Sequence, residues 1–201
     1  MKRAGGERGR APPHEVRIIG GRWKRSKLPV ADVPGLRPTP DRVRETLFNW
    51  LGQDLDGWRC LDAFAGSGAL GFEAASRGAA SVTLVEKGRA AFEALQVNAR
   101  LLHAGQVRLE RGDALEFLAR DRSSYDVVFV DPPFSEGVPP QLLERLCARL
   151  AARGRVYLES GDAFGAVPGW QVVKHGRAGQ VHFHLLEHDP DAVATTMRTG
   201  A

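Results

Sequence analysis

The sequence of 201 residues predicts an α/β fold with a mostly parallel, seven-stranded sheet that ends in an antiparallel hairpin. From residue 58 onward, short apolar segments alternate with helical stretches, which is typical of parallel strands covered by helices on both faces. Near the end, WQVVKHG and QVHFHLLEH are joined only by RAGQ, which leaves no room for a crossover helix. A small basic extension precedes this unit.

The same alternation sets the boundaries of the expected elements. Strands are expected at 58–63, 81–86, 106–111, 125–130 and 154–159, before the two hairpin strands. Helices are expected at 68–77, 89–103, 114–120 and 139–152. In the extension we expect a small hairpin around Gly20–Gly21 and a helix capped by Thr39, with Pro40 in its first position.

Composition narrows the class of protein. With 43% hydrophobic and 26% charged residues, the chain has enough apolar side chains for a core, and no apolar run is long enough to span a membrane. The N-terminus lacks the apolar centre of a secretion signal, and two widely separated cysteines suit a reducing compartment, so we expect a cytoplasmic protein. The expected organisation is a tail at 1–14, an extension of a hairpin and a helix at 15–54, the main domain at 55–188 and a flexible tail at 189–201.

Charge is distributed unevenly along the chain. Residues 1–27 contain nine Lys or Arg and only two Glu, whereas the whole chain has 28 basic and 24 acidic residues. The entire basic excess therefore lies in this N-terminal arm. Such asymmetry predicts a polyanionic partner. A solvated tail that keeps the protein soluble is the alternative.

The segment CLDAFAGSGALG places a glycine-rich turn between the first expected strand of the main domain and the next helix. Gly66, Gly68 and Gly71 form G-x-G-x-x-G, and Glu86 ends the following strand. Such a turn lets the backbone approach a cofactor, and the acid accepts hydrogen bonds from ribose hydroxyls. The turn alone does not separate a dinucleotide from S-adenosylmethionine, although Asp62 suits the cationic groups of the latter better.

The strand YDVVFV ends in the tetrapeptide Asp131, Pro132, Pro133 and Phe134. The prolines restrict the backbone and hold nearby carbonyls, so a carboxylate and a fixed carbonyl can accept both N–H groups of an exocyclic amine. Phe134 supplies a stacking surface, and the amine lone pair is then aimed at an electrophilic methyl group. The alternative is a strand stopped by prolines, with Phe134 in the core. Since hydride transfer needs no such tetrapeptide, we expect S-adenosylmethionine and the Rossmann-like class I methyltransferase fold.

Four segments together resemble one family: RIIGGRWKRSKLPV, GLRPTPDRVRETLFNWL, LDAFAGSGALGFEAASRGA and VFVDPPF. They are similar to the bacterial 16S rRNA guanine-N2-methyltransferases of the RsmD family, which methylate guanine 966. The resemblance runs from Val16 to His188. The cofactor-binding residues expected from it and from the turn are Asp62, Phe64, Gly66, Gly68, Glu86, Asp113 and Ala114. The expected catalytic residues are Asp131, Pro132, Pro133 and Phe134.

The tetrapeptide does not by itself identify the substrate, because related sites methylate adenine N6, cytosine N4, guanine N2 and protein glutamine. No insertion is long enough for a separate recognition domain, so recognition falls to residues 1–50 and short loops. We expect a folded 16S rRNA, either naked or within a partly assembled 30S particle, and a monomeric enzyme. Another amine methylase, acting on adenine or a release-factor glutamine, and a non-catalytic RNA-binding assembly factor remain the alternatives.

Basic and aromatic residues of the extension are candidates for RNA contact. They are Arg22, Trp23, Lys24, Arg25, Lys27, Arg37, Arg42 and Arg44. Equally good alternatives are a solvated helix face for the helix arginines and a place in the hairpin core for Trp23. His182, His184 and His188 lie close in sequence without an accompanying acid or cysteine cluster, so no metal site is predicted.

Overall fold

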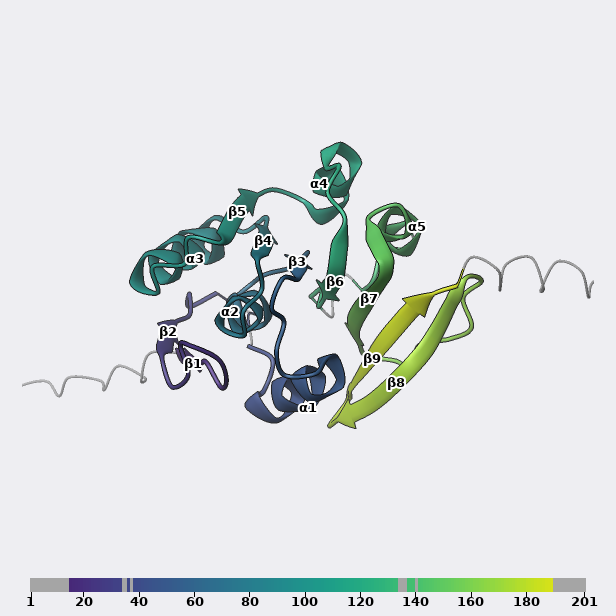
Figure 1. The fold of residues 1–201 in the computed structure, drawn as a ribbon, viewed down its shortest axis with the longest axis horizontal. Coiled ribbons are helices and arrows are strands. Elements are labelled where there is room, and N and C mark those ends of the chain that lie inside the picture. Colours follow the sequence, from purple (N-terminus) through teal and green to yellow (C-terminus); the bar gives the residue numbers. More distant parts are fainter. Residues whose placement is uncertain (1–14, 34–35, 37, 134–136, 140, 190–201) are drawn as a thin grey trace, which may run out of the picture.

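The computed structural model confirms the predicted α/β architecture (Figure 1). It describes residues 15–33, 36, 38–133, 137–139 and 141–189. The seven strands of the main sheet are β3 (Arg59–Asp62), β4 (Ser81–Glu86), β5 (Val107–Arg111), β6 (Tyr125–Val130), β7 (Leu150–Ser160), β8 (Trp170–Ala178) and β9 (Val181–His188). Their order is β5-β4-β3-β6-β7-β9-β8, and β9 is the strand that runs antiparallel to both of its neighbours.

Within the described residues, five helices flank the sheet: α1 (Asp41–Leu51), α2 (Ala69–Ser76), α3 (Arg89–Leu101), α4 (Ala114–Arg120) and α5 (Leu142–Cys147). The helices α1, α2 and α3 pack on one face and α4 and α5 on the other, with a separate apolar cluster beneath each group (Figure 1). None of the helices in the described ranges combines the length and apolar character that a membrane span needs.

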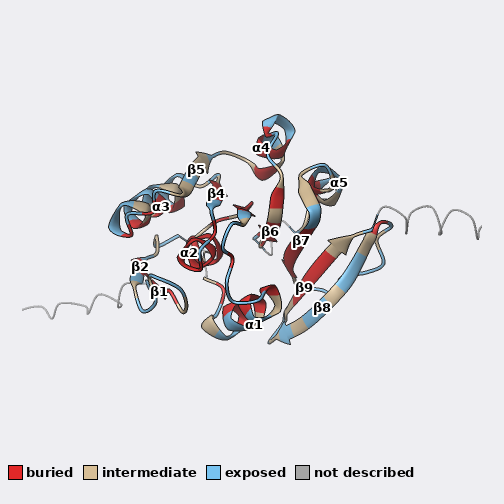
Figure 2. Ribbon diagram, viewed as in Figure 1, coloured by how far each residue is buried: buried red, intermediate tan, exposed pale blue. Residues whose placement is uncertain are grey.

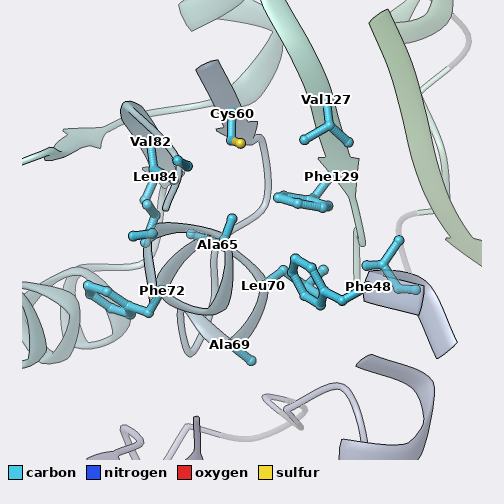
Figure 3. Close-up of a cluster of buried hydrophobic side chains, with 14 of the residues drawn as sticks. Phe48, Cys60, Ala65, Ala69, Leu70, Phe72, Val82, Leu84, Val127 and Phe129 are labelled. Carbon is cyan, nitrogen blue, oxygen red and sulfur yellow. The ribbon is translucent and has the colours of Figure 1, made fainter. Parts of the chain in front are cut away.

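The helix α2 lies at the centre of the larger apolar cluster. All of its residues, from Ala69 to Ser76, are buried, and Figure 2 shows this helix red on every side. Figure 3 shows Leu70 of α2 and Phe48 of α1 below Phe129 of β6. The ring centres of Phe48 and Phe129 lie 6.1 Å apart. The extension therefore shares its core with the sheet and does not form a core of its own.

The N-terminal hairpin, β1 (Glu15–Arg17) and β2 (Lys27–Pro29), is fastened to α2 by hydrogen bonds. The Ser76 hydroxyl donates to the Gly20 carbonyl at 2.6 Å and accepts from the Trp23 amide at 3.0 Å. Gly21 adopts a left-handed conformation (φ +70°), and an added Cβ would lie 1.9 Å from the Ser76 carbonyl oxygen. Only glycine fits there, which explains the Gly20–Gly21 pair at the predicted hairpin.

Two predicted boundaries are wrong. The expected helix at 139–152 is only α5, because β7 begins at Leu150 and pairs with Tyr125 of β6. Thr39 does not cap α1: Pro40 is the N-cap residue, and no side chain supplies a capping hydrogen bond. The hydroxyl of Thr39 instead donates to Asp131. In both places a contact with a distant strand outweighs the local preference.

Candidate functional site

The carboxyl ends of β3, β4 and β6 meet at one edge of the sheet and surround a cavity of about 890 Å³. This is where open parallel sheets bind ligands, because the loops leaving adjacent strands diverge there. Its lining includes most of the predicted cofactor-binding and catalytic residues: Asp62, Phe64, Gly66, Glu86, Asp113, Ala114, Asp131, Pro132 and Pro133. Phe134 and Arg37, also predicted site residues, lie outside the described part of the chain.

Asp62 sits where β3 runs into the glycine-rich turn, and only 1% of it is exposed. Its Oδ2 accepts a hydrogen bond from the Gly71 amide at 3.0 Å, near the start of α2. A helix N-terminus is where proteins often bind phosphate, but here a carboxylate of the protein already lies close to it. The site therefore disfavours a pyrophosphate and favours a cationic ligand.

Glu86 at the end of β4 holds two loops by their backbone amides. Its Oε2 accepts from the Gly66 amide at 2.8 Å and its Oε1 from the Gly88 amide at 2.5 Å. Because each carboxylate oxygen has two lone pairs, both oxygens can still accept from a ligand in the cavity that Glu86 lines. The carboxylate is thus oriented by the protein before any ligand binds.

Asp113 is the N-cap of α4. Its Oδ1 accepts hydrogen bonds from the amides of Leu115 (2.7 Å) and Glu116 (3.2 Å). Capping fixes the side chain at the cavity wall beside Ala114. Gly68, by contrast, is not among the lining residues. Its φ is +78°, and an added Cβ would collide with Phe72 and Leu95, so its absence of a side chain serves the packing of α2 and α3.

Asp131 follows β6 on the opposite side of the cavity from Glu86's strand. Its Oδ2 accepts a hydrogen bond from the Thr39 hydroxyl at 3.2 Å, a contact between residues far apart in the chain. Pro132 is buried, and Pro133 is exposed at the cavity wall. The Pro133 carbonyl accepts from the Gly137 amide at 3.2 Å, which closes the loop after the two prolines.

Acids at the cavity are difficult to ionise together. Burial raises the pKa of Asp62 to about 7, although the hydrogen bond from Gly71 opposes this, and the charges of Asp131 and Glu86 add to the rise. Burial also raises the pKa of Asp131 to about 6, against the hydrogen bond from Thr39. Carboxyl groups that are hard to ionise together would be stabilised by a positively charged ligand.

Glu159 on β7 is a further acid that the sequence analysis missed. The register pairs Val130 with Leu158, so Glu159 and Asp131 follow at the same level of the sheet. Glu159 accepts a hydrogen bond from the Tyr157 hydroxyl at 2.8 Å, and burial, with the nearby Asp131 charge, raises its pKa to about 8. The signal was present in the sequence, because Glu159 ends the strand expected at 154–159 just as Glu86 ends the one expected at 81–86.

Thr39, the other residue that was missed, reaches the cavity from the extension together with Val33 and Leu36. The sequence analysis assigned it to helix capping, which is its common local role. Its position next to Asp131 depends on the packing of α1 against β6. No local pattern in RPTPD shows that contact.

The basic residues of the extension that were predicted to contact RNA are either exposed or buried. The exposed ones are Arg22, Lys24, Arg25, Lys27 and Arg42. Trp23 is partly buried against the core, and the Arg22 guanidinium lies 4.2 Å from its ring centre. The hairpin tip therefore presents positive charge to solvent.

Arg44 is a correction, because the structure places it in the interior with 0% exposure. Its guanidinium contacts the Asp41 carboxylate at 2.6 Å and the Glu73 carboxylate at 3.3 Å. Arg77, the C-cap residue of α2, contacts the same Glu73 at 2.8 Å, so this buried acid joins α1 to α2 through Arg44 and is also paired at the end of its own helix. The predicted contact of Arg44 with RNA is wrong, since its guanidinium is buried and paired with carboxylates inside the protein.

The sheet order, the ligand cavity at the strand ends and the acid-lined glycine turn define a Rossmann-like class I methyltransferase. Residues 16–187 match the model of the family described as conserved hypothetical protein 95. Ribosomal RNA small subunit methyltransferase D of Escherichia coli is 46% identical over 87% of this chain and 91% of its own length. The protein of that name from Haemophilus influenzae is 39% identical over 87% and 94%.

Solved structures agree with this assignment. The putative methyltransferase yhhF from Escherichia coli superposes with a TM-score of 0.79 at 44% identity, covering 88% of this chain and 99% of that one. The putative methylase HI0767 from Haemophilus influenzae gives 0.70 at 35% identity over 88% and 99%. The chain belongs to the family of ribosomal RNA small subunit methyltransferase D, and the resemblance found in the sequence is confirmed.

Proposed function

We propose that this enzyme transfers a methyl group from S-adenosylmethionine to the exocyclic N2 of a guanine in 16S rRNA, at the position of guanine 966. One observation carries the proposal. The cavity brings the acids of the glycine-rich turn and Asp131 with its two prolines into a single space. The related enzymes named for small-subunit ribosomal RNA support the choice of substrate.

The residues present fit S-adenosylmethionine. We assign Asp62 and the backbone around Gly66 to its amino-acid portion, Glu86 to its ribose and Asp113 with Ala114 to its adenine. The fit rests on charge, because burial and neighbouring acids oppose the ionisation of Asp62, and the cofactor carries an ammonium and a sulfonium. When bound, the cofactor supplies an electrophilic methyl group.

Asp131 and the loop after it form the half of the cavity that we assign to the target base. Thr39 engages Oδ2 of Asp131, so Oδ1 is the oxygen that we assign to the guanine amine. An amine hydrogen-bonded to a carboxylate keeps its lone pair directed away from that carboxylate, towards the assigned cofactor half. With its pKa raised to about 6, Asp131 can also hold the proton that the amine loses.

Recognition of the RNA falls, in this proposal, to the exposed basic residues of the hairpin tip and α1. Such contacts bind phosphates and position the substrate without reading its sequence. The target guanine must leave its stack to enter the cavity, as in other enzymes that modify bases. Arg22, Lys24 and Arg25 lie next to the Ser76 end of α2, on the docked hairpin.

Tritiated S-adenosylmethionine tests the substrate. The full chain would be incubated with 30S particles lacking the modification, naked 16S rRNA, duplex DNA and release factor. Label on 16S rRNA that is recovered as N2-methylguanosine is the expected result, and comparing particles with naked RNA shows which form is preferred. Label confined to protein or DNA would overturn the proposal, and binding of cofactor and RNA without any transfer would favour the assembly-factor alternative.

A further inference from the structure

Three histidines gather on one face of the C-terminal hairpin, away from the methyl-transfer cavity. Strand pairing places His175 of β8 directly opposite His184 of β9, with His182 two residues before His184 on the same strand. Side chains alternate along a strand, so all three point to the same face. That face is the one on which Leu186 packs beneath α4 and α5. His188, which the sequence analysis grouped with His182 and His184, instead lies against Trp170, with ring centres 5.2 Å apart.

The ring nitrogens of these three histidines are close enough to share one ion. One nitrogen from each residue lies within 4.8 Å of the other two. Nε2 of His175 and Nδ1 of His182 are 3.1 Å apart, and their rings are within 7° of parallel. Metal–nitrogen bonds of 2.0–2.1 Å in a tetrahedral site place the ligand nitrogens roughly 3.4 Å apart. Small side-chain movements would therefore bring all three nitrogens to that spacing.

His184 is the buried member of the cluster. It is only 2% exposed, and its Nδ1 is a buried polar atom without a hydrogen-bond partner. Its Nε2 accepts from the Phe164 amide at 3.1 Å, so the neutral ring carries its proton on Nδ1. A buried donor without an acceptor is costly, and moving the proton to Nε2 would instead give Nδ1 a lone pair that can bind a metal ion.

Two polar neighbours of the cluster make hydrogen bonds elsewhere. Arg177 is paired with His182 across the hairpin, but its Nε donates to the Gly179 carbonyl at 2.9 Å. The Ser160 hydroxyl, on the neighbouring strand, donates to the Asp162 carbonyl. His175 is exposed and His182 partly exposed, so an ion can enter from solvent.

We propose that His175, His182 and His184 form a binding site for a divalent transition metal ion of the Zn²⁺ class. Three imidazoles on paired strands suit such an ion, and a water molecule completes the coordination. Ligation through Nδ1 of His184 requires the ring proton on Nε2, so the contact with the Phe164 amide must open on binding. The ion would tie β8 to β9, with no part in methyl transfer.

Metal titration of the full chain, prepared without a histidine tag, tests the site. Zn²⁺ binding would be followed by calorimetry, and Co²⁺ binding by its visible absorption, which distinguishes tetrahedral from octahedral sites. We expect one ion per chain and at least a tenfold loss of affinity in His175→Gln, whose exposed position keeps the fold intact. His103→Gln and His188→Gln, outside the cluster, should bind as the unmodified protein does.

A second measurement keeps the proposal testable if affinity is low. In the ¹H–¹⁵N spectrum of the labelled protein, Zn²⁺ should shift the Phe164 amide resonance in the unmodified chain and in His188→Gln, but not in His175→Gln. No saturable binding of either ion, or binding that His175→Gln leaves unchanged, would overturn the proposal. An unshifted Phe164 amide in a protein that binds one ion would remove Nδ1 of His184 from the ligand set.

Discussion

The two halves of the cavity are built in different ways. In the assigned cofactor half, each acid is held by backbone amides of a loop or of the first turn of a helix, as Glu86 is by Gly66 and Gly88. In the assigned target half, Asp131 is held by Thr39, a side chain contributed by the extension. The acids of the first half are thus oriented without the extension, whereas Asp131 is oriented by it. Substitutions in the two halves should consequently separate cofactor binding from turnover.

The largest expected effect is that of Asp131→Ala. Removing the acceptor that orients the amine should lower kcat by about 10²–10⁴-fold, the usual range for loss of a positioned acid–base or electrostatic group. Affinity for S-adenosylmethionine, measured by calorimetry, should change by less than about threefold, because the assigned cofactor contacts are intact. Asp126→Ala, at the other end of the same strand, is the matched control. Full activity in Asp131→Ala would remove the assigned role.

Glu86→Ala should have the opposite pattern. It removes the carboxylate that orients two loops and that we assign to the ribose, so cofactor affinity should fall by about 10–100-fold, as expected for charge-assisted hydrogen bonds. At saturating cofactor, kcat should be largely restored. Glu110→Ala is the control, since Glu110 pairs with Arg108 and Arg120 outside the cavity. An unchanged dissociation constant would contradict the division into halves.

Thr39→Val tests whether the extension completes the target half. Loss of one hydrogen bond to Asp131 should lower kcat roughly three- to tenfold without changing cofactor affinity. It should also move the acidic limb of the pH–rate profile. If catalysis needs ionised Asp131, this acidic limb lies near pH 6. The Thr39 hydroxyl lowers the pKa of Asp131 by stabilising its carboxylate. Removing the hydroxyl raises the pKa, so activity should be lost at higher pH than in the unmodified enzyme.

Thr46→Val is the matched control for this shift, because the Thr46 hydroxyl donates only within α1, to the Arg42 carbonyl. Both variants exchange a hydroxyl for a methyl group in the extension. A limb that stays in place in Thr39→Val, or that moves equally in Thr46→Val, would show that Thr39 does not act through Asp131.

The smallest effect on catalysis is expected from the exposed basic residues. Changing Lys24, Arg25 and Lys27 together to Ala should weaken RNA binding and reduce the slope of log affinity against log salt by up to about 3. At low salt and saturating RNA, kcat should be nearly unchanged. The control is the triple change of Arg122, Arg145 and Arg153, which are equally exposed but lie on the α4 and α5 side. Equal slopes in the two triple variants would exclude the hairpin tip as the RNA-binding surface.

The same comparison shows what could be predicted from the sequence. The assigned cofactor half follows from local patterns, because Asp62 and Glu86 end strands, Asp113 precedes a helix and Gly66 lies in the glycine-rich turn. Of the described residues in the assigned target half, the sequence predicted only Asp131 and the two prolines. The role of Thr39 depends on how α1 packs, and a threonine before a helix has an obvious local explanation.

Arg42 and Arg44 show the same limit in the extension. They are two residues apart on α1, yet one is exposed and the other fully buried. The pattern of the helix places Arg44 near the apolar face beside Val43 and Leu47, but its buried partner Glu73 is on another helix. The sequence does not show that a charged residue is buried when the residue that neutralises it is distant in the chain.

The most direct measurement of the central claim is a crystal structure of the enzyme with S-adenosylmethionine bound. The account predicts that its amino-acid portion lies beside Asp62, its ribose on Glu86, and its sulfonium methyl directed towards Asp131. A methyl group that points away from Asp131, or is separated from it by the protein backbone, would contradict the assignment of the two halves.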